Sequence, residues 1–147
     1  MTVPILANIV RLYKALGHPA RLRIVAMLRS GELCACQITA VLELAPSTVS
    51  AHLAELRRAG LVEERKAGRW VHYRLAETDA TLAVLEALWQ QLKRDTQIRN
   101  DHTVVKRLRT VSVEQLCRVD LDLAQLAISR SGSGGLQRSL RQIRRGN

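Results

Sequence analysis

Apolar residues recur every three or four positions through most of the chain, which is the spacing of helices that bury one face. In the first 60 residues this spacing predicts four helices, at about 5–16, 19–30, 36–44 and 47–59. Pro19 and Pro46 favour the starts of the second and fourth helices, because a first-turn position needs no backbone N–H. The third helix is short, and only a tight turn separates it from the fourth.

The spacing changes to a period of two directly after the fourth helix. Residues 61–66 and 70–75 alternate like half-buried strands around a glycine-containing turn, so they predict a β-hairpin. A further helix follows, from about 79 to at least 93. Two helices, a helix-turn-helix, a hairpin and a helix make a winged helix-turn-helix, so the predicted fold is mainly α with a small β-hairpin.

The last third of the chain is predicted to add one helix and a basic tail. Ser112 and Gln115 have the spacing of a capping box, which predicts a helix from 113 to about 128. The predicted domains are the winged helix-turn-helix at 1–98, a C-terminal helical extension at 99–128, and a Ser/Gly linker with a basic tail at 129–147.

Composition indicates nucleic acid as a binding partner and argues against a membrane protein and an enzyme. The chain has 23 Lys and Arg against 13 Asp and Glu, a net charge of +10, which favours nucleic acid before an anionic membrane. No apolar run approaches the roughly 18–20 residues of a membrane span, and no targeting segment is evident, so a cytoplasmic protein is expected. There is no Gly-rich phosphate loop, HExxH motif or carboxylate pair on an apolar face, so the chain is not expected to be an enzyme.

Small polar side chains and cations gather where a winged helix-turn-helix meets DNA, at the start of its second helix and at the wing. A solvated polar face is the alternative for any one of these residues, but together with the net charge they favour double-stranded DNA. The predicted DNA contacts are Ser47, Thr48, Ser50, His52, Arg57, Arg65, Lys66 and Arg69.

Several separated motifs resemble the ArsR/SmtB family of metal-sensing repressors. In order, they are ALGHPARLRI at 15–24, ELCAC at 32–36, STVSAHL at 47–53, LRRAGLV at 56–62, and the stretch from Gly68-Arg69 to Tyr73-Arg74-Leu75. The resemblance covers about residues 5–95. It implies a homodimer joined through the first helix and the helix after the wing, an operator of two half-sites, and release of DNA when an inducer binds.

The ELCAC motif resembles the arsenic- and cadmium-sensing branches of that family. Thiolates select soft ions, so As(III) or Sb(III) is the expected inducer, with Cd(II), Pb(II) or Zn(II) as alternatives. Cys34 and Cys36 would lie about 200° apart on a regular helix, so they can bind one ion only if Cys34 stands at or before the helix start. Binding there would distort the short helix that supports the DNA-reading helix.

The sequence offers one candidate for a third ligand. Arsenic sensors of the family commonly have a third cysteine three residues after the second, where this chain has Thr39. Cys117 is the one remaining cysteine and the candidate third ligand, and a buried hydrophobic role is the alternative. A thiol redox switch through Cys34 and Cys36 is the rival mechanism, and a methylated arsenical would need only two thiolates.

The other polar residues do not have the spacing of metal ligands. Residues 79–95 contain no histidine, so the zinc site that the family places on this helix is not expected. His18 is expected to cap a helix and His72 to lie on the hairpin surface. Asp101 and His102 are interpreted as a solvated loop rather than as ligands.

Overall fold

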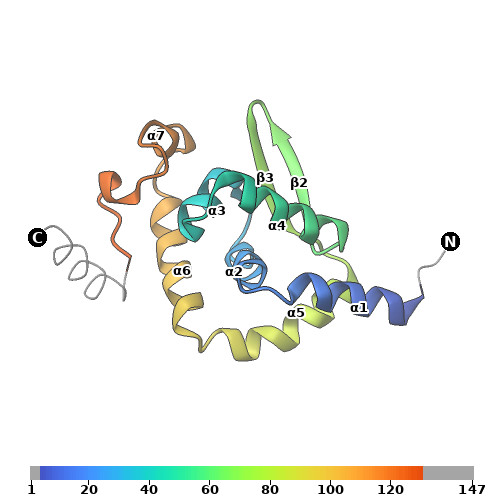
Figure 1. Cartoon of the computed structure of the whole chain (residues 1–147). Helices are drawn as coiled ribbons and strands as arrows, with labels where there is room; N and C mark the ends of the chain where they lie inside the picture. Colours follow the sequence, from blue (N-terminus) through green and yellow to red (C-terminus); the bar gives the residue numbers. More distant parts are fainter. Residues whose placement is uncertain (1–3, 131–147) are drawn as a thin grey trace, which may run out of the picture.

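The computed structural model describes residues 4–130, arranged as Figure 1 shows. Residues 1–3 and 131–147, which include most of the predicted Ser/Gly linker and the basic tail after it, lie outside the described part. Within residues 4–130, no helix is long and apolar enough to cross a membrane. The elements are α1 (Ile5–Leu16), α2 (Pro19–Leu28), β1 (Leu33–Cys34), α3 (Ala35–Leu42), α4 (Pro46–Arg58), β2 (Val62–Ala67), β3 (Trp70–Leu75), α5 (Asp79–Leu92), α6 (Thr96–Leu108), α7 (Val113–Arg118) and the 3-10 helix η1 (Leu123–Leu126).

The winged core, residues 5–92, is organised around α2. This helix contacts α1, α3, α4 and β3, and its Ile24 and Val25 are fully buried. Leu53 and Leu56 bring α4 against the same apolar core. Burying a side chain of this kind contributes about 1.5–3 kcal/mol. The apolar stripe thereby fixes α4 with its opposite, polar face outward, and the predicted winged helix-turn-helix is confirmed.

The sheet has one strand more than the predicted hairpin. Strands β2 and β3 form the wing, and β1 pairs antiparallel with β3, so the strand order is β1-β3-β2. The register places Leu33 opposite Tyr73 and Cys34 opposite His72. Gly68 has φ 59° in the wing turn, a conformation that glycine adopts at no steric cost. The short β1 joins the start of α3 directly to the wing.

The C-terminal extension, residues 96–130, differs from its prediction. The predicted single helix from 113 to about 128 is wrong, because α7 ends at Arg118, Asp120 and Leu121 have positive φ, and only a short 3-10 helix follows. Helix α6 has no predicted counterpart, and the expected domain boundary after residue 98 falls inside it. The interpretation of Asp101 as part of a solvated loop is also wrong, because it lies in α6 and is only 2% exposed.

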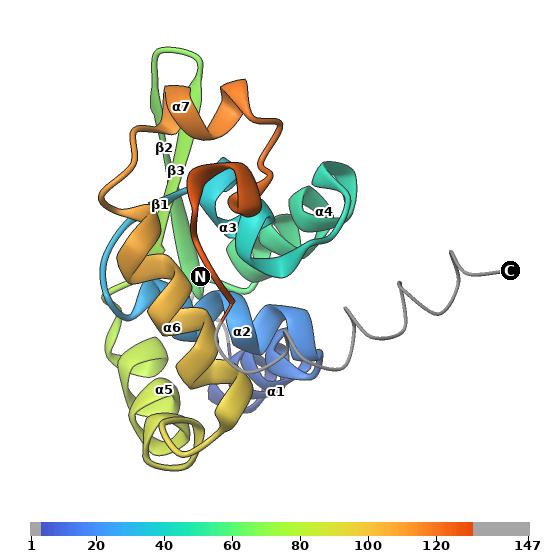
Figure 2. The same ribbon diagram turned by 90° about the vertical axis from the view of Figure 1, so that its left-hand side faces the viewer.

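Figure 2 shows the extension along one side of the winged core, with α6 next to α2 and α7 next to α3. The Asp101 carboxylate accepts two hydrogen bonds from the Arg23 guanidinium of α2, at 2.8 and 2.9 Å. At the end of α6, Arg109 donates to the carbonyls of Gly31 and Glu32. Arg130 donates to the last carbonyls of α3, Val41 among them. Charged side chains therefore fix the position of the extension on the core.

Candidate metalloid site and nucleic-acid interface

Cys34 stands at the N-cap of α3. Its backbone is extended, with φ −72° and ψ 148°, and its thiol accepts a hydrogen bond from the backbone N–H of Gln37. In return, the Gln37 side chain accepts from the Cys34 backbone N–H at 2.8 Å. This pair of bonds is a capping box built on a thiol, and it places Cys34 before the helix, where a shared site with Cys36 requires it.

The two thiols of the CAC motif differ in protonation. The Cys36 thiol donates a hydrogen bond to Cys34, and with the α3 backbone N–H groups and His72 it lowers the pKa of Cys34 to about 6 although burial opposes this. The same hydrogen bond, reinforced by burial, raises the pKa of Cys36 above its ordinary value. Near neutral pH, Cys34 is therefore the thiolate and Cys36 holds the proton.

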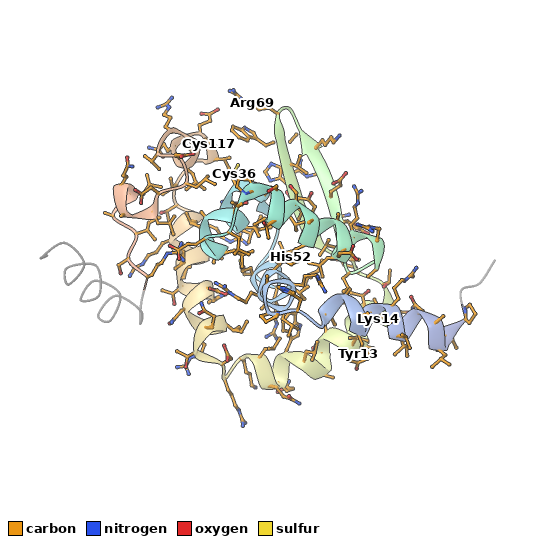
Figure 3. The ribbon with its side chains drawn as sticks, in the orientation of Figure 1. Tyr13, Lys14, Cys36, His52, Arg69 and Cys117 are labelled. Atoms are coloured by element: carbon orange, nitrogen blue, oxygen red, sulfur yellow. The ribbon has the colours of Figure 1, made fainter. Side chains whose placement is uncertain are left out.

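Cys117 of α7 lies next to Cys36 of α3, and Figure 3 shows the two side chains together. Their sulfur atoms are 3.6 Å apart, although 81 positions separate the two residues in the sequence. Cys36 thus contacts both of the other thiols, and we call these three residues the sulfur cluster. No group of three His, Cys, Asp or Glu side chains in residues 4–130 has the arrangement of a finished metal site. An ion held by all three sulfur atoms would therefore require these side chains to move toward it.

The sulfur cluster is tied to the wing by two residues that sequence reasoning did not select. Glu32, two positions before Cys34, accepts hydrogen bonds from Arg65 of β2 at 2.5 and 3.2 Å. His72 of β3 lies opposite Cys34 in the sheet, with its Nδ1 3.8 Å from a Glu32 oxygen. His72 is half-buried beside the cluster rather than on the open hairpin surface that was expected.

The predicted DNA contacts at the start of α4 lie on the surface. Pro46 occupies the first turn of α4, and Ser47, Thr48 and Ser50 are all exposed. On the wing, Lys66 and Arg69 are exposed and form no ion pair with any residue in 4–130. Helix α4 contacts β2, so the polar start of α4 and the wing belong to one side of the molecule (Figure 1).

The two other predicted arginine contacts are already paired within the chain. Arg57 lies 2.6 Å from Glu64, and Arg65 is bonded to Glu32. These ion pairs are exposed and therefore weak, in the range of about 0–1 kcal/mol, so phosphate oxygens can compete for the guanidinium groups. DNA binding through Arg65 would release Glu32 beside the sulfur cluster.

His52 points toward the winged core rather than away from it. Its ring centroid is 4.4 Å from that of His18, with the ring planes tilted by 43°, and its Nδ1 lies 3.3 Å from Arg21. Burial lowers the pKa of His52, and electrostatic interactions with His18 and Arg21 add to this effect. His18 caps α2 as expected, accepting from the Ala20 N–H. The role of His52 in DNA binding stays a prediction.

A broad apolar surface is open on the N-terminal side. Monomeric proteins rarely expose so many large apolar side chains together, so this surface is typical of a protein–protein contact. Its members lie on α1 and α5 and are 41–80% exposed: Ile5, Leu6, Ile9, Val10, Tyr13 and Leu82.

A three-stranded winged helix-turn-helix with an exposed polar reading helix is the architecture of a DNA-binding transcription regulator. The family described as "Bacterial regulatory protein, arsR family" matches residues 18–64. The arsenical resistance operon repressor of Escherichia coli K12 is 38% identical over 96 residues, which cover 62% of this chain and 82% of that protein. The chain belongs to the ArsR family.

Other relatives are named as regulators of several kinds. Arsenic resistance transcriptional regulator ArsR1 of Pseudomonas putida KT2440 is 45% identical over 64 residues, 43% of this chain but only 50% of that protein. The structure of HlyU from Vibrio cholerae N16961 has a TM-score of 0.55 and 39% identity, covering 60% of this chain and 96% of that one. The relatives are transcriptional regulators rather than enzymes, and they include arsenic and cadmium regulators.

Proposed function

We propose that this chain is a dimeric repressor that As(III) or Sb(III) releases from operator DNA by binding to Cys34, Cys36 and Cys117. The observation that carries the proposal is the place of Cys34, which caps α3 and pairs with the wing in one sheet. Helix α3, which packs against the proposed DNA-reading helix α4, and the wing therefore meet at one residue. The names of the Escherichia coli and Pseudomonas putida relatives support arsenic as the inducer.

The sulfur cluster has the chemistry that a pyramidal ion needs. Arsenous acid would exchange its three hydroxyl groups for three sulfur atoms, so that each As–S bond forms as one water leaves. The thiol groups supply the protons that leave with the hydroxyl groups as water, except at Cys34, which enters as a thiolate. The exchange therefore takes up one proton from solvent, and three neutral As–S bonds replace the hydrogen bonds among the thiols.

Binding would act on DNA through the cap of α3. Once its sulfur is bonded to arsenic, Cys34 is a poorer acceptor for the Gln37 N–H, and loss of such a cap costs about 0.5–2 kcal/mol. A shift of Cys34 toward the bound ion would also disturb its pairing with His72 in the wing. A coupling of about 1–3 kcal/mol between inducer and DNA is enough for a functional switch.

The DNA interface that we propose combines the start of α4 with the wing. Ser47, Thr48 and Ser50 would meet base edges and phosphates in the major groove, while Lys66 and Arg69 would meet the backbone. The exposed apolar surface of α1 and α5 would join two copies of the chain. Two reading helices then address two half-sites on the same duplex.

The test first uses the reduced protein to select a DNA duplex from a random library. Release of the protein from that duplex is then measured by fluorescence anisotropy, at constant salt and with a phosphine reductant. Arsenite should release the wild-type protein, and Cys34→Ser or Cys36→Ser should abolish that response. Cys117→Ser should weaken arsenite at least about tenfold, because one of three As–S bonds is lost. Phenylarsine oxide, which needs only two thiols, should still release Cys117→Ser. An undiminished arsenite response in the Cys34→Ser/Cys36→Ser double variant would exclude this site.

A second candidate, a redox switch, is favoured by the 3.6 Å between Cys36 and Cys117. Peroxide would oxidise one thiol to a sulfenic acid and release water, and the other thiol would displace a second water to form the disulfide. One solved relative is the reduced form of HlyU from Vibrio cholerae, with a TM-score of 0.52. Release by peroxide without arsenite, reversed by dithiothreitol and absent in Cys117→Ser, would favour this candidate.

Release by Cd(II), Pb(II) or Zn(II) instead of arsenite would identify a metal-ion sensor.

A further inference from the structure

A cavity of about 580 Å³ opens where α2, α5 and α6 meet, and its lining includes no residue of the sulfur cluster or of α4. Its floor is apolar and comes from all three helices. Met27 belongs to α2, Trp89 and Leu92 to α5, and Ile98 to α6. Cavities of roughly 300–1,000 Å³ with apolar floors and a few polar groups are the usual sites for small organic ligands.

The rim of this cavity is cationic. Arg29, Lys93 and Arg99 line it together with His102, and none of its lining residues is acidic. Within the described residues 4–130, the three Lys and Arg side chains form no ion pair with a carboxylate, whereas Arg23 and Arg65 each do. The Arg29 guanidinium lies over the Trp89 ring, 5.0 Å from its centroid. This stacking leaves the N–H edge of Arg29 available to a ligand.

We propose that this cavity binds a small aromatic carboxylate. A flat ring would rest on the apolar floor beside Trp89, where offset stacking is favourable. The carboxylate would accept hydrogen bonds from both Arg29 and Arg99, whose planar guanidinium groups match a carboxylate in shape. A neutral aromatic ligand would leave the cationic rim without a partner, and a bare inorganic anion would leave the floor empty.

The cavity lies away from the apolar surface that we assign to the dimer. That surface consists of α1 and Leu82 near the start of α5, whereas Trp89 and Lys93 line the cavity at the end of α5. Figure 1 shows α1 and α6 at opposite ends of α5. A second copy seated on α1 therefore leaves the cavity open to solvent.

The experiment titrates the full chain with naphthalene-2-carboxylate, using calorimetry for affinity and the indole N–H resonances for location. Trp70 and Trp89 are the two tryptophans. The indole signal that disappears in a Trp70→Phe variant belongs to Trp70, and the one that remains belongs to Trp89. We expect saturable binding that shifts the Trp89 resonance and leaves that of Trp70 unchanged. The titration uses reduced protein without arsenite or DNA, so its result is independent of the sulfur cluster.

Two substitutions and one matched control decide the matter. Arg29→Gln and Arg99→Gln should each weaken binding about tenfold, as expected when a charge-assisted hydrogen bond is lost. Arg94→Gln removes the same charge from a neighbouring exposed position outside the cavity lining and should change affinity less than about twofold. The neutral analogue 2-naphthylmethanol should bind at least about tenfold more weakly. Absence of saturable binding, equal binding of the neutral analogue, or equal weakening by Arg94→Gln would overturn the proposal.

Discussion

The winged core and the C-terminal extension hold their shapes by different means. In the core, side chains such as Leu12, Ile24 and Leu53 are 0–1% exposed, and burial of apolar area is the main source of stability. The extension also buries apolar residues, but arginine hydrogen bonds fix its position at three places, most deeply at Arg23 and Asp101. Apolar burial is non-directional, whereas a bidentate ion pair sets orientation. We infer that the polar contacts are what bring Cys117 to Cys36.

The largest effect is expected in the core. Leu53→Ala removes a fully buried side chain from α4 and should lower the free energy of unfolding by about 2–5 kcal/mol, through lost burial and the cavity left behind. DNA binding and the arsenite response should both be lost at temperatures near the reduced midpoint. Urea unfolding measures the first effect and anisotropy the second. Leu44→Ala is the control, because Leu44 is 37% exposed and its loss should cost little.

The extension should respond differently to the loss of its ion pair. Asp101→Ala leaves Arg23 without its carboxylate partner and should lower the free energy of unfolding by about 2–3 kcal/mol. This is less than the roughly 3–5 kcal/mol lost when a fully buried pair is broken, because the Arg23 side chain is 22% exposed. Urea unfolding checks this value. DNA binding should persist while arsenite becomes less effective at release, because Cys117 is no longer held beside Cys36.

An apolar replacement of the same pair tests whether direction matters. Arg23→Met combined with Asp101→Leu removes both charges and should recover most of the lost stability. If the ion pair sets the position of α6, this double variant is stable but still less sensitive to arsenite than the wild type. Full recovery of the arsenite response would mean that apolar packing alone positions the extension.

Titration of Cys34 provides a finer test of the junction between the two regions. In the wild type, one thiolate should form as pH rises through about 6, and Cys34→Ser should remove it from the ultraviolet thiolate absorbance. Cys36→Ala removes the donor that contributes most to this shift, so the pKa of Cys34 should rise toward the ordinary value near 8.5. An unchanged midpoint in Cys36→Ala would show that the α3 backbone N–H groups and His72 lower the pKa without the Cys36 thiol.

The sequence predicted the winged core well because its local signals agree. Apolar spacing, first-turn prolines and a glycine turn all indicate the same elements, and Cys34 meets the condition that it stand at a helix start. The extension was predicted poorly because Asp101 interrupts the apolar stripe of α6 and makes it look solvated. Its partner Arg23 is 78 positions away. Glu32 and His72 lie beside the cluster because of the pairing between β1 and β3. Strand β1 has only two residues, which is too short to produce a recognisable pattern in the sequence.

The smallest effect concerns the contact that joins the wing to the sulfur cluster. Glu32→Gln breaks an exposed pair with Arg65, so stability should change by no more than about 1 kcal/mol. If Arg65 contacts DNA, its release should raise affinity a few-fold and steepen the slope of log K against log salt by up to about 0.9. Glu63→Gln is the matched control, since it removes the same charge from the wing but frees Arg74, for which no DNA contact is predicted. Equal slopes for the two variants would remove Arg65 from the interface and leave Glu32 as a support for β1 alone.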